Sequence, residues 1–346
     1  MLIYKNMHNL SLHFLIINFN RTTHHYFMKS PVFNFRFALQ TLAIGLLCIT
    51  NLSSKGQISE IHYKIYSVKA EKEVSLSQIA TDMQNSDVLF FGEEHNDSVS
   101  HFLEQKMFEA MHAQYGSKTV LSVEMFDRDV QVVMNEYLKD AIREKNFKRD
   151  ARVWSNYGDY RPMIEFSKTH NLHVICANAP SRYTNLAGRK GQAALKELSE
   201  QSKKFFAPLP YSIASGAYYN KLVQLTSHEP PSATDTSAKT VVPMASMGGF
   251  DLITAQSLWD ATMAYSIAEY IKKNKGKKVL QVNGRFHSDE KFAIVTQLKN
   301  YNPKLKSLVI SAGSDESFPS IDWNKFKHLG DYIIITDPTV PKTYEE

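Results

Sequence analysis

The feature that most constrains the fold is a repeated alternation between apolar, strand-like runs and segments with helical apolar spacing. The strand-like runs are residues 87–91, 119–123, 172–177, 278–282, 307–310 and 332–335. The helix-like segments are residues 98–115, 128–143, 160–170, 289–299 and about 253–273. Fully apolar strands that alternate with helices are typical of a parallel sheet covered on both faces. We therefore predict an α/β fold: a mostly parallel central sheet flanked by helices, with a smaller helical cap domain.

The predicted cap comes from two interruptions of this alternation. Helical insertions are expected at about residues 128–160 and 190–275, within an α/β domain that spans residues 57–346. The second insertion includes a Ser/Thr/Pro-rich stretch at 227–240, which predicts an exposed loop. The chain shows no internal repeat.

Residues 1–56 differ from the rest of the chain in charge. They contain five Lys or Arg residues and no Asp or Glu, whereas the remaining 290 residues hold 35 basic and 35 acidic residues. An apolar run at 37–49 follows basic residues and precedes small polar ones, which is the pattern of a secretory signal peptide. Cleavage is expected before Gln57, and Met28 is the expected true start of translation.

This leader predicts export to the periplasm or the cell envelope, with an uncleaved N-terminal anchor as the alternative. Gly45 and Leu47 make Cys48 a poor lipidation site, so a lipoprotein is not favoured. Removal of the leader leaves Cys176 alone, which excludes an intrachain disulfide. Because the exported part is formally neutral, a basic face for nucleic acid is not expected.

Two Gly-x-x-His turns follow two of the predicted strands. They occupy residues 92–95 and 284–287, and Glu124 ends the strand that begins at residue 119. The carboxyl ends of parallel strands meet at one edge of a sheet, where ligands bind. Imidazole and carboxylate groups gathered there suit a divalent metal or acid–base chemistry.

Two uses of these side chains stay open. As metal ligands, His95, Glu124 and His287 would hold an ion that activates water, with Glu93 or Glu124 as the base. As structural groups, both His residues would only complete the turns that contain them. The occurrence of two such turns favours the functional interpretation.

Asp260 is a carboxylate within an otherwise apolar part of the helix predicted at about 253–273. If it is buried, it needs a partner. We expect that partner to be Arg128 or Arg161.

Five sequence blocks resemble the ChaN-like haem-binding uptake family of the Tiki superfamily, over roughly residues 75–312. The blocks are DVLFFGEEHND, LSVEMFDRDVQ, NYGDYRPMIEFSKTHNLHVICANAP, AQSLWDATMAYSIAEYI and VNGRFHSDE. The resemblance implies a bacterial exported protein or lipoprotein tied to iron acquisition. It also implies a parallel-sheet α/β domain with a smaller helical domain.

The same resemblance implies a haem site in which a Tyr ligates the iron, a His assists, and haem lies between two protomers. Phenolate ligation suits ferric iron. The candidate haem contacts are Tyr157, Tyr160, Arg161, Asn178, Arg285 and His287, with Tyr218, Tyr219 and Tyr265 as further tyrosines.

The wider superfamily includes metal-dependent proteases built on two Gly-x-x-His motifs and a Glu. That resemblance implies His95, Glu124 and His287 as metal ligands, with Glu93 inside the first motif. This chain departs from the pattern at Glu94, and at Arg285 and the Phe that follows it, where small residues are common. Arg285 would repel a metal cation or pair with a haem propionate.

We therefore expect an exported haem-binding protein involved in iron or haem uptake. A metal-dependent, peptidase-like hydrolase with a divalent ion in place of haem is the alternative, and a periplasmic interaction module is the third interpretation. The expected partners are haem, a second protomer in a homodimer and an outer-membrane haem receptor, but not nucleic acid.

Overall fold

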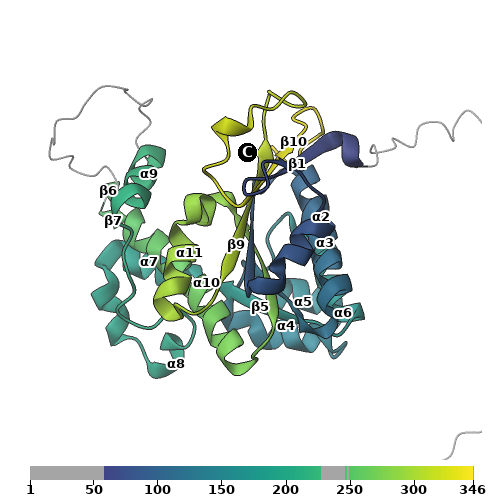
Figure 1. The fold of residues 1–346 in the computed structure, drawn as a ribbon. Coiled ribbons are helices and arrows are strands. Elements are labelled where there is room, and N and C mark those ends of the chain that lie inside the picture. The colour runs from purple at the N-terminus through teal and green to yellow at the C-terminus, as the bar shows by residue number, and fades with distance from the viewer. Residues whose placement is uncertain (1–57, 227–245, 248, 346) are drawn as a thin grey trace, which may run out of the picture. The chain divides into compact units, whose positions relative to one another are not determined.

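An eight-stranded sheet lies at the centre of the structure, a computed structural model that describes residues 58–226, 246–247 and 249–345. The strands are β1 (Tyr63–Ser67), β2 (Lys72–Glu73), β3 (Val88–Glu93), β4 (Thr119–Asp127), β5 (His173–Asn178), β8 (Lys278–Gly284), β9 (Ser307–Ser314) and β10 (Tyr332–Thr336). Their order is β2-β1-β10-β9-β3-β8-β4-β5 (Figure 1). The strands from β10 to β5 run parallel, and β1 and β2 add an antiparallel edge.

All six predicted strands are present, so the predicted mostly parallel α/β sheet is confirmed. The sequence does not predict β1 or β2. In β1 only Ile65 and Ser67 are buried, because this strand lies near the edge of the sheet. It therefore lacks the continuous apolar run that marks the central strands.

Helices cover both faces of the sheet (Figure 1). One face packs against α2 (Leu76–Asp82), α3 (Ser98–Tyr115), α4 (Gln131–Leu138), α5 (Glu144–Asp150) and α6 (Tyr157–Thr169). The other face packs against α10 (Leu252–Lys273) and α11 (Ala293–Tyr301). Outside α10 lie α7 (Ser181–Lys190), α8 (Glu200–Lys203), α9 (Gly216–Thr226) and the hairpin of β6 (Ser246–Met247) and β7 (Phe250–Asp251).

Each central strand contributes side chains to two apolar cores, one on each face of the sheet. In β3, Leu89 and Phe91 pack on the side of α3 and α6, whereas Val88 and Phe90 pack on the side of α10 and α11. Successive side chains of a strand point to opposite faces, and here both faces are covered. This is why residues 88–91 of the strand are all apolar, and not only alternate ones.

One predicted helix, residues 128–143, is divided in the structure. Helix α4 ends at Leu138, and α5 begins only at Glu144. Asp140 lies between them with a φ of 59°, a left-handed conformation that a continuing helix does not allow. The prediction of one continuous helix is therefore wrong.

The predicted leader with Cys48 and the predicted loop at 227–240 lie outside the described residues. Within the ranges that the structure covers, no helix combines the length and the apolar character that crossing a bilayer requires. The helices of the two predicted insertions include α4 and α5 in the first and α8 to α10 in the second.

The start of α3 is fixed by one buried carboxylate. Asp97 is the N-cap residue, and its Oδ1 accepts hydrogen bonds from the backbone N–H groups of Val99 and Ser100, at 2.9 and 3.2 Å. Its Oδ2 accepts from the hydroxyls of Ser100 and Thr336, at 2.8 and 2.6 Å. Asp97 thus ties the first turn of α3 to the end of β10.

Replacing Asp97 with Ala should lower the free energy of unfolding by about 2 kcal/mol, because the helix cap and the bond to Thr336 are lost together. Urea unfolding followed by circular dichroism measures the change. Asp97→Asn retains an acceptor for the cap and should cost less than Asp97→Ala. Equal losses in the two variants would contradict the capping role.

Candidate functional site

The two Gly-x-x-His turns lie side by side because β3 and β8 are neighbours in the sheet. Their register pairs Gly92 with Asn283 and Glu93 with Gly284. Both strands run in the same direction, so both turns leave the carboxyl edge of the sheet together. The predicted meeting of the two motifs at this edge is therefore present in the fold.

Both glycines are required by close approach. A Cβ atom on Gly92 would lie 2.8 Å from the Cα of Arg285 and 2.7 Å from Oγ of Ser288. A Cβ atom on Gly284 would lie 2.7 Å from Nε2 of His95. These distances are shorter than van der Waals contact, so any larger residue would push the two turns apart.

The two ring nitrogens of His95 have different surroundings: Nδ1 contacts Glu93, and Nε2 lies over the second turn. Its Nδ1 lies 2.9 Å from Oε1 of the buried Glu93. Its Nε2 faces Gly284 and has no hydrogen-bond partner among the described residues. The ring packs edge-on against Trp154, and 30% of the side chain is exposed. Burial alone would lower the pKa of His95, but the hydrogen bond to Glu93 and the charge of Glu124 raise it.

His287 lies between two buried carboxylates. Its Nδ1 is 2.6 Å from Oδ1 of Asp260, and its Nε2 is 3.4 Å from Oε1 of Glu124. Burial opposes the imidazolium, but Glu124 and Asp260 together raise the pKa of His287 well above its ordinary value. Asp260 also accepts a hydrogen bond from Tyr218, and Glu124 accepts one from the backbone N–H of Gly284.

The prediction that Asp260 pairs with Arg128 or Arg161 is wrong. The carboxylate is buried as expected, but it pairs with His287 and Tyr218. Arg128 instead bonds Glu269, and Arg161 bonds Glu144. Sequence spacing alone does not tell which charged group of a distant segment faces a given helix position.

A second buried cluster lies beneath His95, and the sequence analysis missed two of its members. His101 of α3 places Nδ1 at 3.0 Å from Oε2 of Glu93 and 3.4 Å from Oε2 of Glu104. Its Nε2 lies 3.0 Å from the backbone carbonyl of His95. In the part of the chain that the structure describes, Glu93, His101 and Glu104 are the group whose ligand atoms all lie within 4.8 Å of one another.

The cluster shifts the ionisation of all three groups. Burial opposes the imidazolium, but Glu104 and Glu93 raise the pKa of His101 to about 12. Burial alone would raise the pKa of Glu93, yet the neighbouring imidazoles of His101 and His95 hold it well below its usual range. Burial and the charge of Glu93 raise the pKa of Glu104 well above its usual range. In the absence of a bound cation, charge balance thus calls for a proton on both His101 and Glu104.

One signal in the sequence could have identified this cluster. Helix α3 buries Val99, Leu103, Met107 and Phe108, and His101 and Glu104 interrupt that apolar surface three residues apart. Side chains separated by three positions lie on the same face of a helix. Polar groups on a buried face need partners, which here come from the end of β3.

The other predicted haem contacts differ in their exposure and in the partners that they already have. Arg285 pairs with Glu94 at 3.2 Å and with Asp289 at 3.0 Å, and 28% of its side chain is exposed. Arg161 is exposed and bonds Glu144. Asn178 is buried at the end of β5, and its Oδ1 accepts a hydrogen bond from the N–H of Ala179.

The two candidate tyrosines are both buried in the core, but only Tyr160 contacts the site. The hydroxyl of Tyr160 donates to Oε1 of Glu93 at 2.7 Å and lies 3.5 Å from Nδ1 of His95. The hydroxyl of Tyr157 is buried and has no hydrogen-bond partner in the described ranges. Burial and nearby carboxylates raise the pKa of both phenols.

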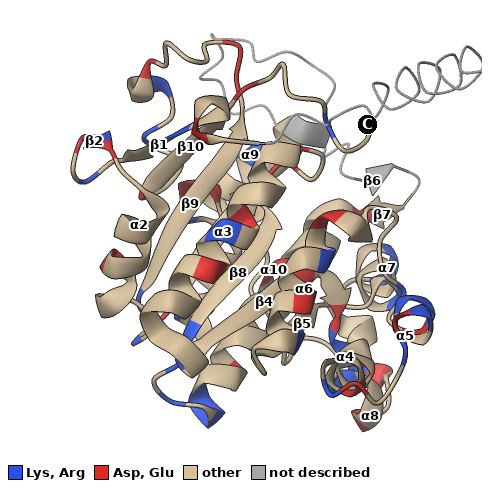
Figure 2. Ribbon diagram, turned by 90° about the vertical axis from the view of Figure 1, so that its right-hand side faces the viewer, with Lys and Arg blue, Asp and Glu red and all other residues tan. Residues whose placement is uncertain are grey.

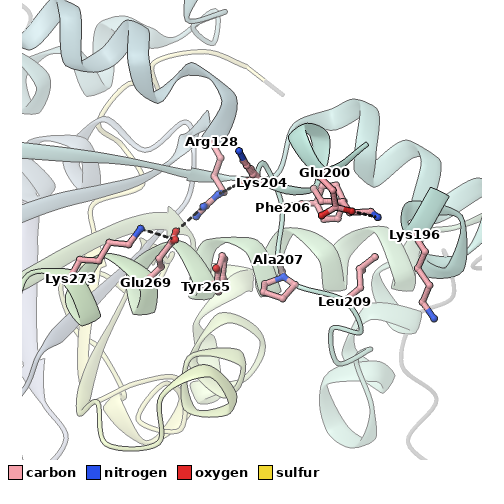
Figure 3. A pocket seen from close by; sticks show the side chains of 12 residues that line it. Arg128, Lys196, Glu200, Lys204, Phe206, Ala207, Leu209, Tyr265, Glu269 and Lys273 are labelled. Atoms are coloured by element: carbon pink, nitrogen blue, oxygen red, sulfur yellow. Dashed lines mark hydrogen bonds and ion pairs between the residues drawn. The ribbon is translucent and has the colours of Figure 1, made fainter. Parts of the chain in front are cut away.

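A cavity of about 810 Å³ lies apart from these groups, between α10 and the segment 196–209 (Figure 3). Its floor is apolar, with Phe206, Leu209 and Tyr265. Arg128 and Lys273 both pair with Glu269 at its edge, each at 2.9 Å. Neither Gly-x-x-His motif contributes to this cavity, so it is a separate feature of the surface.

Charges on the rest of the described surface are mixed. Figure 2 shows Lys and Arg interspersed with Asp and Glu over the helices. This agrees with the formal neutrality of residues 57–346. The fold and the site thus define a class of protein: an α/β protein that gathers histidine and carboxylate side chains at the carboxyl edge of a parallel sheet.

Comparison with known proteins identifies the family. Residues 79–298 match the family described as haem-binding uptake, Tiki superfamily, ChaN. This match covers more than half of the 346 residues, so the chain belongs to that family and the resemblance found in the sequence is confirmed.

One solved structure supports the fold, and a second aligns more weakly. The structure reported for cofacial haem binding to ChaN of Campylobacter jejuni aligns with a TM-score of 0.60 and 16% sequence identity, over 80% of this chain and 98% of that chain. The structure of the type III effector HopBA1 aligns with a TM-score of 0.37 and 12% identity, over 76% of this chain and 93% of that chain. No curated protein sequence matches this chain.

The contrast between the two tyrosines predicts different costs of removing their hydroxyls. Tyr160→Phe should lower the free energy of unfolding by about 1.5–3 kcal/mol, because it removes a buried hydrogen bond to an ionised carboxylate. Tyr157→Phe is the matched control and should be close to neutral, because its hydroxyl has no partner to lose. Chemical unfolding of both variants measures this difference, and a larger loss in Tyr157→Phe would contradict the assignment.

Proposed function

We propose that this chain is an exported haem-binding protein of iron or haem uptake, with haem over the carboxyl edge of the sheet beside His95. Membership of the haem-binding uptake family supports the ligand. The single observation that carries the location is the state of the His95 ring. Glu93 holds Nδ1, whereas Nε2 has no hydrogen-bond partner in the described part of the chain.

His95 fits an iron ligand for two reasons. A histidine that ligates a metal through one nitrogen typically gives its other N–H to a carboxylate or a carbonyl, and Glu93 lies where that acceptor is needed. The side chain is also 30% exposed, so part of the His95 ring is accessible to a flat ligand. Haem iron bound at this position would be held by imidazole, as in many haem proteins.

Tyr157 and Tyr160 remain the proposed tyrosines of the family's haem site. Both phenols are buried and hard to ionise, so phenolate ligation would require ferric iron itself to stabilise the anion. Tyr160 is the stronger candidate of the two, because its hydroxyl lies next to the His95 ring. Ligation by Tyr160 would have to break its hydrogen bond to Glu93.

Propionate recognition would be local, because the exported part of the chain is formally neutral. Arg285 is the proposed contact, since it pairs with Glu94, the residue before His95, and is partly exposed. A propionate would replace Glu94 as one of its partners. Arg161, Asn178 and His287 are the further proposed contacts.

The wider biological setting is also a proposal. Cofacial haem binding in ChaN of Campylobacter jejuni suggests a haem-bridged homodimer for this chain. The signal-peptide pattern of residues 1–56 supports export to the periplasm or the cell envelope. An outer-membrane haem receptor is the proposed donor of the ligand.

Haem titration of the purified protein tests the proposal. A shifted Soret band should saturate at micromolar haem, and His95→Ala should weaken binding at least tenfold, about 1.4 kcal/mol. His170→Ala is the matched control, because His170 is the exposed C-cap residue of α6 and its Nδ1 bonds the carbonyl of Phe166, away from the site. It should bind haem as the unmodified protein does.

Two further variants locate the ligand. Loss of binding in Tyr160→Phe together with His95→Ala would support the site at the sheet edge. Loss in Tyr265→Phe with His95→Ala unaffected would place haem in the separate cavity and overturn the proposed location. No Soret shift in the unmodified protein would overturn haem binding itself.

A metal-dependent hydrolase is the second candidate, and one observation favours it. Glu124 contacts His287 and accepts a hydrogen bond from the N–H of Gly284, and His95 packs against Gly284; these contacts support the proposed trio. A divalent ion held there would activate water, with Glu93 or Glu124 as the base.

The hydrolase candidate predicts peptide cleavage that depends on added Zn²⁺ or Mn²⁺ and is lost on chelation. Glu124→Gln should then reduce kcat at least 100-fold, as expected when a metal ligand or base is removed. The exposed Glu73, changed to Gln, is the control. Cleavage that persists in Glu124→Gln would exclude this trio as the catalytic site.

A further inference from the structure

The structure assigns a divalent-cation site to Glu93, His101 and Glu104, one layer beneath the proposed haem position. This site is distinct from the trio of His95, Glu124 and His287, and it does not depend on haem binding. Its ligand class is a first-row divalent metal such as Zn²⁺, Mn²⁺ or Fe²⁺, because the donors are one imidazole and two carboxylates without sulfur.

The three donors are brought together by the two elements that meet below His95. His101 and Glu104 lie three residues apart on one face of α3, and Glu93 is the last residue of β3. All three side chains are buried, with at most 5% exposed. The fold therefore directs two carboxylates toward the Nδ1 atom of a single imidazole.

The spacing of the donors matches a metal coordination sphere. Nδ1 of His101 lies 3.0 Å from Oε2 of Glu93 and 3.4 Å from Oε2 of Glu104. Ligand bonds of about 2.1 Å place neighbouring donors about 3.0 Å apart at right angles and about 3.4 Å apart at tetrahedral angles. Two of the three donor pairs thus have the spacing of a coordination sphere, and all three donors lie within 4.8 Å of one another.

Two buried oxygens supply an independent observation. Oε2 of Glu93 and Oε1 of Glu104 make no hydrogen bond to any residue that the structure describes, although both are shielded from solvent. The contact of Glu93 Oε2 with His101 is short, at 3.0 Å, but it is not a well-formed hydrogen bond. Buried carboxylate oxygens without a donor are costly, and a cation satisfies them.

The surrounding groups are arranged as around a metal ligand. Nε2 of His101 lies 3.0 Å from the backbone carbonyl of His95, which accepts its N–H and leaves Nδ1 free for a metal. Tyr160 donates to the other oxygen of Glu93 and packs edge-on against the His101 ring. These contacts fix the tautomer and the orientation of the proposed ligands.

Charge balance completes the assignment. A divalent cation neutralises two ionised carboxylates when the imidazole is neutral. Without the cation, protons on His101 and Glu104 must supply the same balance. The metal-bound cluster and the protonated cluster differ in metal content, so a metal titration distinguishes them.

The experiment is a Co²⁺ titration of the haem-free, full-length chain, followed by visible absorption and by thermal unfolding. We expect one equivalent of Co²⁺, displaced by Zn²⁺, and a rise in Tm on binding. Glu104→Gln, which is nearly isosteric, should weaken Co²⁺ binding at least tenfold, and His101→Ala should abolish it. Glu109→Gln, on the same helix but partly exposed, is the matched control and should bind normally.

Three outcomes would overturn the site. No Co²⁺ binding by the unmodified chain at about 1 mM metal would exclude even a weak site and favour the protonated cluster. Normal binding in a folded Glu104→Gln variant would exclude this trio. Loss of Co²⁺ in His287→Ala with Glu104→Gln unaffected would place the metal at the other trio.

The Soret band measures haem binding, and the visible absorption of Co²⁺ in the haem-free chain measures metal binding. A negative result in one titration therefore leaves the other proposal open to its own test. If His101→Ala does not fold, Glu93→Gln and Glu104→Gln keep the test decisive. Both keep the volume of the side chain, and circular dichroism verifies their fold before titration.

Discussion

The contact on which the site depends is the close approach of the turns that follow β3 and β8. Gly284 leaves room for the His95 ring, and Gly92 leaves room for the backbone at Arg285. The parallel register of the two strands fixes the position of these turns relative to each other. Because the turns touch, Glu93 is buried beneath His95, while Glu124 of the next strand reaches the N–H of Gly284.

The close approach of the two turns buries several carboxylates. Glu93, Glu104, Glu124 and Asp260 are all buried, and each contacts a histidine. Buried charges persist only where partners compensate the cost of desolvation. Apolar residues of similar volume would give a simpler core, so this concentration of ionisable groups is better explained by ligand binding than by stability.

The architecture follows from the sequence more fully than the site does. Mostly apolar runs indicate the six parallel strands, because burial on both faces leaves few polar positions. The two Gly-x-x-His turns and Glu124 are visible as motifs at strand ends. Strand order is not encoded locally, and neither is the division of helix 128–143 at Asp140. His101 and Glu104 look like ordinary helix residues until Glu93 is placed against them.

Glu93 connects the two layers of the site. Its Oε1 faces His95 and Tyr160, and its Oε2 faces His101. A cation bound by Oε2 would draw negative charge away from Oε1 and weaken the hydrogen bond that Glu93 accepts from His95. The imidazole of His95 would then be a weaker donor to iron. Occupation of the inner trio is therefore expected to lower the affinity of the outer position for haem, and linkage requires haem to lower the affinity for the cation equally.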